Sequence, residues 1–355
     1  MPVTDLQKER IIQMAIKSLA IKYRPTGWDE VVEQGAIKMI LQQQLESEEV
    51  KNAYLFAGGA GTGKTTCARI FANAINNYKG NPIEMDAASN SGVEDVRAII
   101  QQAKTKSLDS EYKIFIIDEC HSISNTGWQA FLKLIEEPPA KSIFIFCTTD
   151  PQKIPKTILS RVQRYDFQRI SHEAVVRRLE YICYCEDVEI VELDALEYIA
   201  KLADGGMRDA ITLMDKCLSY DRDLTIHNVV DALGITDYDT MFHLTDSIIQ
   251  HDADRVIKIV EEVHRSGKDL KQFIKTYTNF VLDLCKYGCL RTFEFIEIPS
   301  IHKMRLDKYT TSDYEDFTRL LNTMVKLNSD IKWETSPKPV IQAVLILRAR
   351  EEDYK

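Results

Sequence analysis

The hydrophobic positions of the first 150 residues form short, nearly continuous runs, which predict strands of a buried sheet. A run with little polar alternation is typical of a parallel strand that is buried on both faces. We expect such strands at residues 53–56, 83–86, 112–117 and 142–147. Helical periodicity follows the first run at residues 66–75 and the second from about residue 91. This alternation of strand and helix predicts an α/β domain with a central parallel sheet.

From about residue 171 the strand pattern ends and apolar residues recur at helical spacing. We expect helices at residues 173–185, 193–203, 207–219 and 226–233. More helices are predicted from residue 238 onward, with apolar faces that pack against one another or against other subunits. Those faces carry Phe273, Tyr277, Phe280, Val281, Leu284, Val340, Val344 and Leu345.

The segments before the first strand and the length of the chain complete the expected organisation. Residues 1–20 have the spacing of an amphipathic helix, and 23–34, which contains Pro25, predicts an extended or turning connector. A chain of 355 residues is too long for one average domain. We expect three domains, at residues 1–169, 170–236 and 237–355.

A glycine-rich loop between the first predicted strand and its helix is the strongest chemical signal. It reads Gly58-Gly59-Ala60-Gly61-Thr62-Gly63-Lys64-Thr65. Glycines let the backbone wrap closely around a polyphosphate, so that successive N–H groups and the helix N-terminus face the anion. In this pattern Lys64 reaches the β- and γ-phosphates and Thr65 coordinates Mg²⁺. The strand before the loop and the helix after it favour this interpretation over a chance glycine-rich turn.

Two adjacent carboxylates, Asp118 and Glu119, directly follow the predicted strand at 112–117. Ligands of an open α/β sheet bind at the carboxyl ends of its strands. There Asp118 can hold the Mg²⁺ shell, while Glu119 orients or deprotonates the water that attacks a nucleotide phosphate. A strand that ends in Asp-Glu is a weak signal alone, and it becomes strong when a phosphate loop precedes it.

Three further residues are candidates for contact with a transferred phosphate. Thr149 follows the strand at 142–147 and either hydrogen-bonds the γ-phosphate or the attacking water, or only caps the strand. Arg161 follows a short helix that Pro155 opens, and is either a surface residue or a donor that stabilises the transferring phosphoryl group. Arg208 begins a helix, where a buried cation is unfavourable without a nearby anion, and is a candidate second phosphate sensor.

Composition and charge narrow the class of protein. The chain is 45% hydrophobic and 28% charged, as is ordinary for a soluble globular protein. A formal net charge of -9 argues against a protein that coats DNA through overall positive charge, but permits a local basic surface. Arg97, Lys104 and Lys106 lie along one predicted helix and form either a solvated face or contacts to nucleic-acid phosphates.

Cysteine usage and the lack of long apolar runs favour a reduced, cytoplasmic location. The eight cysteines form no CxxC pair and no Cys/His spacing typical of structural zinc, and several lie in apolar patterns. Cys285 and Cys289 are four residues apart and are expected in the core rather than on a metal. The sequence shows no targeting segment and no run that would span a membrane.

Several short motifs occur in order along nearly the whole chain. They are Ala20-Ile21-Lys22-Tyr23-Arg24-Pro25, Val31-Val32-Glu33-Gln34, Asp86-Ala87-Ala88-Ser89, Asp118-Glu119-Cys120-His121, Leu134-Ile135-Glu136-Glu137-Pro138-Pro139, Thr148-Thr149-Asp150-Pro151-Gln152-Lys153-Ile154-Pro155 and Ile158-Leu159-Ser160-Arg161. Together with the phosphate loop, they resemble the bacterial clamp-loader ATPase, the gamma/tau subunit of DNA polymerase III in the AAA+ superfamily.

The resemblance implies a fold and a set of residue roles. The fold is an AAA+ P-loop domain with a central parallel sheet, a small helical lid domain and an all-helical C-terminal collar domain. By this likeness Asp118 and Glu119 are the Walker B pair, Thr149 is sensor 1, Arg208 is sensor 2, and Arg161 is the arginine finger for a neighbouring subunit. The implied catalytic residues are Lys64, Asp118, Glu119, Thr149, Arg161 and Arg208. The implied nucleotide-binding residues are Tyr23, Arg24, Val31, Val32, Gly58, Gly59, Ala60, Gly61, Thr62, Gly63, Lys64, Thr65, Thr66 and Arg208, with Thr65 and Asp118 as Mg²⁺ ligands.

The resemblance also implies an assembly, because an arginine that acts in trans requires an oligomer. The family forms a pentameric ring or spiral with delta- and delta-prime-type subunits, which grips a sliding clamp and primer–template DNA. ATP hydrolysis would load the clamp during DNA replication. The alternatives are an AAA+ helicase or branch-migration ATPase, and a structural clamp-loader subunit that has lost hydrolysis. The intact Lys64, Thr65, Asp118 and Glu119 argue against the last of these.

The sequence departs from the family pattern in three places. Residues 76–82 stand where bacterial members usually carry a four-cysteine zinc module, so no zinc is expected. The Ser-Arg-Cys motif reads Ser160-Arg161-Val162, which keeps the arginine. The sequence also ends soon after the expected collar, so by this likeness we expect it to lack the C-terminal domains through which long forms contact the replicative helicase and polymerase.

Overall fold

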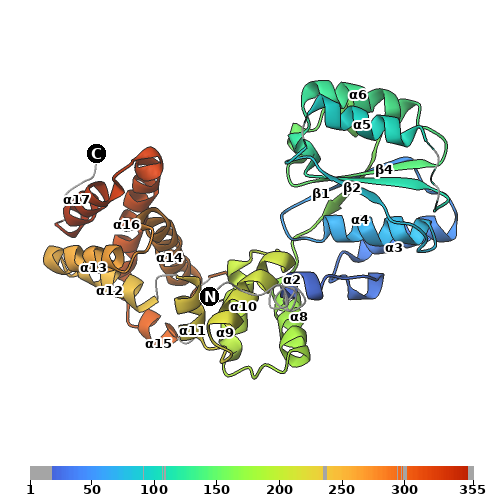
Figure 1. The fold of residues 1–355 in the computed structure, drawn as a ribbon. Helices are drawn as coiled ribbons and strands as arrows, with labels where there is room; N and C mark the ends of the chain where they lie inside the picture. The colour runs from blue at the N-terminus through green and yellow to red at the C-terminus, as the bar shows by residue number, and fades with distance from the viewer. Residues whose placement is uncertain are drawn as a thin grey trace, which may run out of the picture. The chain divides into compact units, whose positions relative to one another are not determined.

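The computed structural model describes residues 18–350 except for 91, 106, 108, 235–237, 294, 297 and 299–301. These residues divide into two compact units, which are described separately below (Figure 1). The first unit holds the residues up to 187 together with 199–215, and the second holds 188–198 together with the residues from 216 onward. The helix expected at residues 1–20 lies mostly outside the described residues, as does Lys106.

A five-stranded parallel sheet forms the centre of the first unit, as the apolar runs predict. In spatial order its strands are β2 (Ile83–Asp86), β3 (Lys113–Asp118), β4 (Ser142–Thr148), β1 (Ala53–Gly58) and β5 (Gln163–Phe167). β4 therefore lies between β1 and β3, with Thr148 opposite Ala57 on one side and Phe146 opposite Ile117 on the other. Because all three strands run parallel, the segments that follow them emerge side by side at one edge of the sheet.

Helices cover both faces of this sheet (Figure 1). One face carries α3 (Gly35–Glu46) and α4 (Lys64–Ile75), and the other carries α5 (Val93–Ala103) and α6 (Asn125–Glu136). Successive residues of a strand point to opposite faces, so Ile116 packs in the α3 and α4 layer and Phe115 in the α5 and α6 layer. Both faces of β1, β3 and β4 are covered, which explains why these three strands are almost continuously apolar.

Several short elements belong to the first unit, and four longer helices follow β5 in the chain. The short elements are α2 (Leu19–Lys22), η1 (Trp28–Glu30), η2 (Cys120–Ser122), η3 (Pro151–Lys153) and α7 (Lys156–Leu159). The later helices are α8 (His172–Cys185), α9 (Leu193–Leu202), α10 (Met207–Tyr220) and α11 (Ile226–Leu233). These four helices agree with the sequence-based expectation to within one residue at each end.

The rest of the second unit is helical. Its elements are α12 (Tyr238–Ile249), α13 (Ala253–Arg265), α14 (Leu270–Leu290), α15 (Lys303–Leu306), α16 (Thr311–Asp330), η5 (Ile331–Trp333) and α17 (Pro337–Ala349). Tyr277, Val281 and Leu284 are fully buried within the chain, and Phe280 meets Phe242 edge to face with ring centroids 4.8 Å apart. The predicted apolar faces therefore pack mainly against one another. No described helix is both long and apolar enough to cross a membrane.

Some features of the structure differ from the sequence-based expectation or were not predicted. The helices α3 and α6 and the edge strand β5 have no counterpart among the predicted elements. The expectation of a buried Cys285 and Cys289 is wrong for Cys289, which is exposed, while Cys285 is half-buried. This position on α14 faces water because the apolar side of the helix is formed by other residues, such as Leu284 and Tyr287.

We predict that Phe131→Ala lowers the free energy of unfolding of the first unit by about 3–5 kcal/mol, because it leaves a cavity in the core. Phe131 is fully buried and meets Phe146 edge to face at 5.4 Å. The measurement is urea denaturation followed by the fluorescence of the buried Trp128, in a chain whose other two tryptophans are replaced by phenylalanine. Lys133→Ala on the exposed side of α6 is the control, and an equal loss in both variants would contradict this packing.

Candidate active site

The glycine-rich loop joins β1 to α4 and closes tightly around its own lysine. Gly61 and Gly63 have φ angles of 68° and 98°, which favour glycine because a Cβ would be strained there. Lys64 is buried, and its Nζ donates a hydrogen bond of 2.6 Å to the carbonyl of Gly59. The hydroxyl of Thr62 donates to the same carbonyl at 2.9 Å. Burial lowers the pKa of Lys64, and the charges of Glu119 and Asp118 oppose that shift.

Thr65 and Asp118 meet at the edge of the sheet where the strands end. Thr65 Oγ1, in the first turn of α4, donates a hydrogen bond of 2.8 Å to Asp118 Oδ2, at the end of β3. Mg²⁺ prefers oxygen ligands and is usually held by one or two protein oxygens together with phosphates. A hydroxyl and a carboxylate beside a phosphate loop fit that donor set. Among the described residues, no group of three or more His, Cys, Asp or Glu is arranged to hold a metal ion.

Glu119 turns away from Asp118 and reaches the end of β4. Its φ of 45° lies in the left-handed region, which is uncommon for a residue with a side chain. In this conformation its carboxylate accepts a hydrogen bond of 2.9 Å from Thr149 Oγ1. Neither predicted role of Thr149 includes this contact with the carboxylate. Sequence reasoning did not assign a role to His121, whose Nδ1 lies 3.2 Å from Glu119 Oε2; its place in the Asp118 to His121 motif was the available signal.

The start of α10 touches the phosphate loop backbone to backbone. The N–H of Met207 donates a hydrogen bond of 3.0 Å to the carbonyl of Gly61. A Cβ built on Gly61 would lie 2.8 Å from Gly206 Cα, a distance that real Cβ atoms essentially never show. Two glycines are therefore needed where these segments meet. Arg208 follows Met207 in the chain, so its backbone lies close to the loop, and its side chain is exposed.

Tyr23 and Arg24 connect α8 with the helix of the phosphate loop. The Tyr23 hydroxyl donates to the carboxylate of Glu186, just after α8. Arg24 Nε donates a hydrogen bond of 3.3 Å to Thr66 Oγ1 on α4. Burial, and next the charge of Arg69, lower the pKa of Arg24, and Arg208 acts in the same direction. Arg24 thus places one guanidinium beside the helix that follows the phosphate loop.

The segment from Val31 to Gln34 secures the connection between β5 and α8. Val31 is buried in the core, and Val32 is half-buried. The side chain of Gln34, which is 8% exposed, donates from Nε2 to the carbonyl of Gln168 at 2.7 Å and accepts from the Gln168 N–H at 3.2 Å. The carboxylate of Glu33 accepts hydrogen bonds from Ser171, the residue that caps α8. Contact of these residues with a nucleotide stays a prediction.

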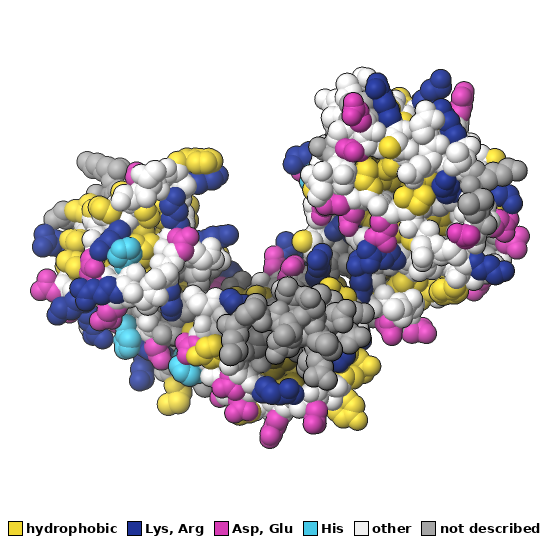
Figure 2. Space-filling view, viewed as in Figure 1, with side chains coloured by type: hydrophobic (Ala, Val, Ile, Leu, Met, Phe, Trp, Pro, Cys, Tyr) yellow, Lys and Arg dark blue, Asp and Glu magenta, His cyan; other side chains and the backbone are white. Residues whose placement is uncertain are grey.

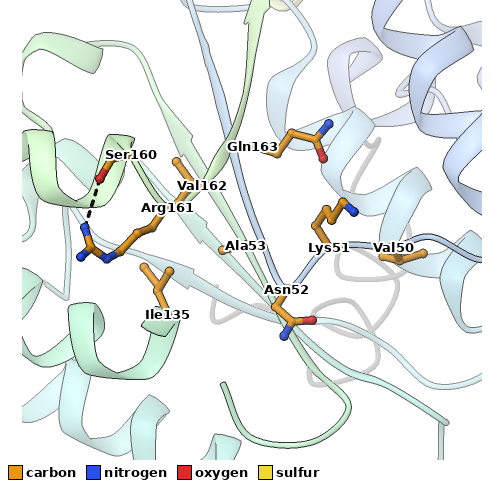
Figure 3. Close-up of a pocket in the computed structure, with 9 residues that line it drawn as sticks. All are labelled: Val50, Lys51, Asn52, Ala53, Ile135, Ser160, Arg161, Val162 and Gln163. Atoms are coloured by element: carbon orange, nitrogen blue, oxygen red, sulfur yellow. Dashed lines mark hydrogen bonds between the residues drawn. The ribbon is translucent and has the colours of Figure 1, made fainter. Parts of the chain in front are cut away.

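Arg161 lies near the amino ends of the strands, whereas the phosphate loop lies at their carboxyl ends. Arg161 precedes β5, whose first residue, Gln163, pairs with Tyr54 near the start of β1. The length of β1, roughly 17 Å at the usual rise per residue, separates this end from Gly58. Arg161 lines an open hollow of about 520 Å³ (Figure 3), together with Val50, Lys51, Asn52, Ala53, Ile135, Ser160, Val162 and Gln163. An arginine side chain is too short to reach from here to a phosphate held by its own loop.

The predicted catalytic residues and Mg²⁺ ligands therefore fall into two groups. Lys64, Thr65, Asp118, Glu119 and Thr149 converge at the carboxyl end of the sheet, with Arg208 beside them. Arg161 differs from these predicted catalytic residues in lying at the amino end. The first group can bind a polyphosphate, hold a divalent cation and position a carboxylate as a general base. Arg161 is too far from this group to contact the same ligand within one chain.

Three family models match successive parts of the chain. Their descriptions are DNA polymerase III, delta subunit (residues 81–171), DNA polymerase III clamp loader subunit, ATPase lid domain (174–221), and DNA polymerase III subunits gamma and tau domain III (224–351). The three matches follow one another with short gaps, so together they cover residues 81–351 almost without interruption.

Relatives with known names agree with these models. The DNA polymerase III subunit tau of Bacillus subtilis is 33% identical over 361 residues, which cover 94% of this chain and 63% of the relative. The gamma/tau subunit of Mycobacterium tuberculosis is 33% identical over 71% of this chain and 48% of the relative. STICHEL-like 1 of Arabidopsis thaliana is 30% identical over 76% of this chain and 26% of its own length. The chain thus spans less than two thirds of each of these relatives.

A solved structure with the same fold is the RuvB Holliday junction branch migration motor of Thermotoga maritima. It superimposes with a TM-score of 0.51 at 22% identity and covers 64% of this chain and 79% of its own. At this identity the likeness concerns the fold alone. From the family models and the named relatives, we conclude that the chain belongs to the gamma/tau family of DNA polymerase III clamp-loader subunits.

Proposed function

We propose that the protein is an ATPase motor subunit of a clamp loader, which hydrolyses ATP to load a sliding clamp onto primer–template DNA. The observation that carries this proposal is the convergence of Lys64, Thr65, Asp118, Glu119 and Thr149 at one edge of the sheet. The match of residues 224–351 to domain III of gamma and tau subunits favours a loader over a helicase. The three domain boundaries expected from the sequence are part of this proposal.

The side chains divide the chemistry of hydrolysis among them. Lys64 binds the terminal phosphates of ATP, and its present bond to the Gly59 carbonyl is replaced when the nucleotide enters. Thr65 and Asp118 would hold Mg²⁺, which neutralises charge on the phosphate oxygens when bound. Glu119 accepts the proton of the attacking water. Thr149 holds the Glu119 carboxylate through its hydroxyl and so fixes the direction from which that proton is taken.

Assembly into a ring completes the site. Because Arg161 lies a strand length away from its own loop, it acts on the ATP of the next subunit. The partners are a sliding clamp, delta- and delta-prime-type subunits in a pentamer, and primer–template DNA. Basic and acidic side chains are interspersed over the visible face in Figure 2, which supports local contacts to DNA phosphates rather than a broad basic field.

We predict that Glu119→Gln abolishes hydrolysis, by about 10²-fold or more, while ATP binding is retained, because the amide cannot accept the proton. The measurement is phosphate release with primed DNA and a cognate clamp, beside nucleotide affinity from fluorescence titration. Glu84→Gln, which removes a carboxylate on β2, is the control. Unchanged hydrolysis in the Glu119 variant would show that another group serves as the base.

Gly61→Ala should weaken ATP binding and lower thermal stability, because its Cβ would collide with Gly206 and separate α10 from the loop. Gly35→Ala, at the start of α3 and outside the loop, is the control, since a Cβ there would meet nothing within 4 Å. Isothermal titration with ATP and a thermal melt of each variant make the comparison. Equal behaviour of the two variants would mean that the contact with α10 does not matter for binding.

A trans-acting Arg161 predicts complementation between two inactive variants. Arg161→Ala protein keeps an intact phosphate loop, and Glu119→Gln protein keeps an intact arginine. Each alone should lose most hydrolysis, about 10³-fold for the arginine. A mixed assembly should regain part of it, because the loop of one variant meets the arginine of the other. Arg164→Ala, on the exposed side of β5, serves as the control. If mixing restores nothing, Arg161 does not act across a subunit boundary.

A further inference from the structure

Arg161 is held in place by acceptors from two helices. Its Nη1 donates to the carbonyl of Thr157 at 2.8 Å and lies 3.0 Å from Ser160 Oγ, in the adjoining turn (Figure 3). Its Nη2 lies 2.9 Å from Glu136 Oε1, at the end of α6. Thr157 and Ser160 are near neighbours in the chain and move with the arginine. Glu136 belongs to a different helix and therefore ties the guanidinium to the rest of the domain.

We propose that Glu136 is a positioning residue for Arg161, holding its guanidinium at the rim of the hollow in the orientation that meets the nucleotide of a neighbouring subunit. This inference rests on the proposed function of Arg161. A guanidinium has more N–H donors than these three acceptors use, so donors remain for a phosphate. The planar group is thereby oriented before the neighbour arrives, which reduces the entropy lost when the contact forms.

The position of Glu136 on its helix supports this role. A carboxylate in the last turn of a helix is disfavoured by the partial negative charge of the helix C-terminus. Glu136 therefore does not stabilise α6 by itself, and Arg161 supplies the compensating positive charge. Its neighbour Glu137 has the same charge and is also exposed, but is not placed on the guanidinium. The contact with Arg161 therefore distinguishes Glu136 from Glu137.

The ion pair between Glu136 and Arg161 is weak, so it can orient the guanidinium without holding it permanently. The two side chains are 40% and 44% exposed, and ion pairs this open to water contribute little to stability. A polyphosphate carries several negative charges, so it competes easily for the guanidinium once a neighbouring subunit presents it. Glu136 can thus aim the arginine without holding it back from the transition state.

The test uses the assembled loader with primed DNA, cognate clamp and ATP. In Glu136→Ala, the maximal rate of hydrolysis should fall about three- to fivefold, with the KM for ATP unchanged because the neighbour's own loop binds the nucleotide. Glu136→Gln keeps an acceptor oxygen at the same place and should retain at least half of the rate. Glu137→Ala should hydrolyse as the unmodified protein does. A thermal melt checks that each variant is folded.

The double variant separates positioning from a general structural effect. Glu136→Ala combined with Arg161→Ala should be no slower than Arg161→Ala alone, because Glu136 acts through the arginine. Additive losses, or a normal rate in Glu136→Ala beside a slow Arg161→Ala, would overturn this inference and leave the proposed function intact. A Glu136→Gln rate as low as that of Glu136→Ala would overturn it as well. A normal rate in Arg161→Ala would instead overturn the trans-acting arginine itself.

Discussion

The hydrogen bonding of β4 to both β1 and β3 is the constraint on which the site depends. β1 leads into the phosphate loop, β3 ends in Asp118, and the strand between them fixes their separation. Sliding β4 by one residue against either neighbour would reverse the faces of its side chains and move Thr149 away from Glu119. The large aromatic residues of β4 in the core, Phe144 and Phe146, therefore also determine the geometry of the catalytic edge.

The elements that sequence reasoning recovered are those with one strong local signal. Strands buried on both faces are continuously apolar, and the later helices have clear periodicity. The edge strand β5 was missed because only Tyr165 and Phe167 of its five residues are buried, so its pattern is short and half polar. α6 contains Gly127, which lowers the local helical signal, although the tight approach of Ile123 requires a glycine there. In both cases, tertiary packing supplies what the local sequence does not indicate.

The site shows the same division between local and distant information. The convergence of Thr65 and Asp118 was predictable, because parallel strands deliver their ends to one edge and the motifs follow those ends. The hydrogen bond from Thr149 to Glu119 was not predictable, because it needs a left-handed backbone at Glu119 that the sequence pattern does not indicate. The pairing of Gly61 with Gly206 joins segments nearly 150 residues apart and is equally invisible in the sequence.

Between β5 and α8, the side chain of Gln34 makes the hydrogen bonds that a neighbouring strand would make. Gln34 offers Gln168 one donor and one acceptor, as a neighbouring strand would at that position, yet it belongs to a separate segment. Breaking a strand pair requires the backbone to peel apart over several residues, whereas an amide side chain releases both bonds by a single rotation. The chain between β5 and α8 is therefore held by a side chain from another segment and not by a further strand of the sheet.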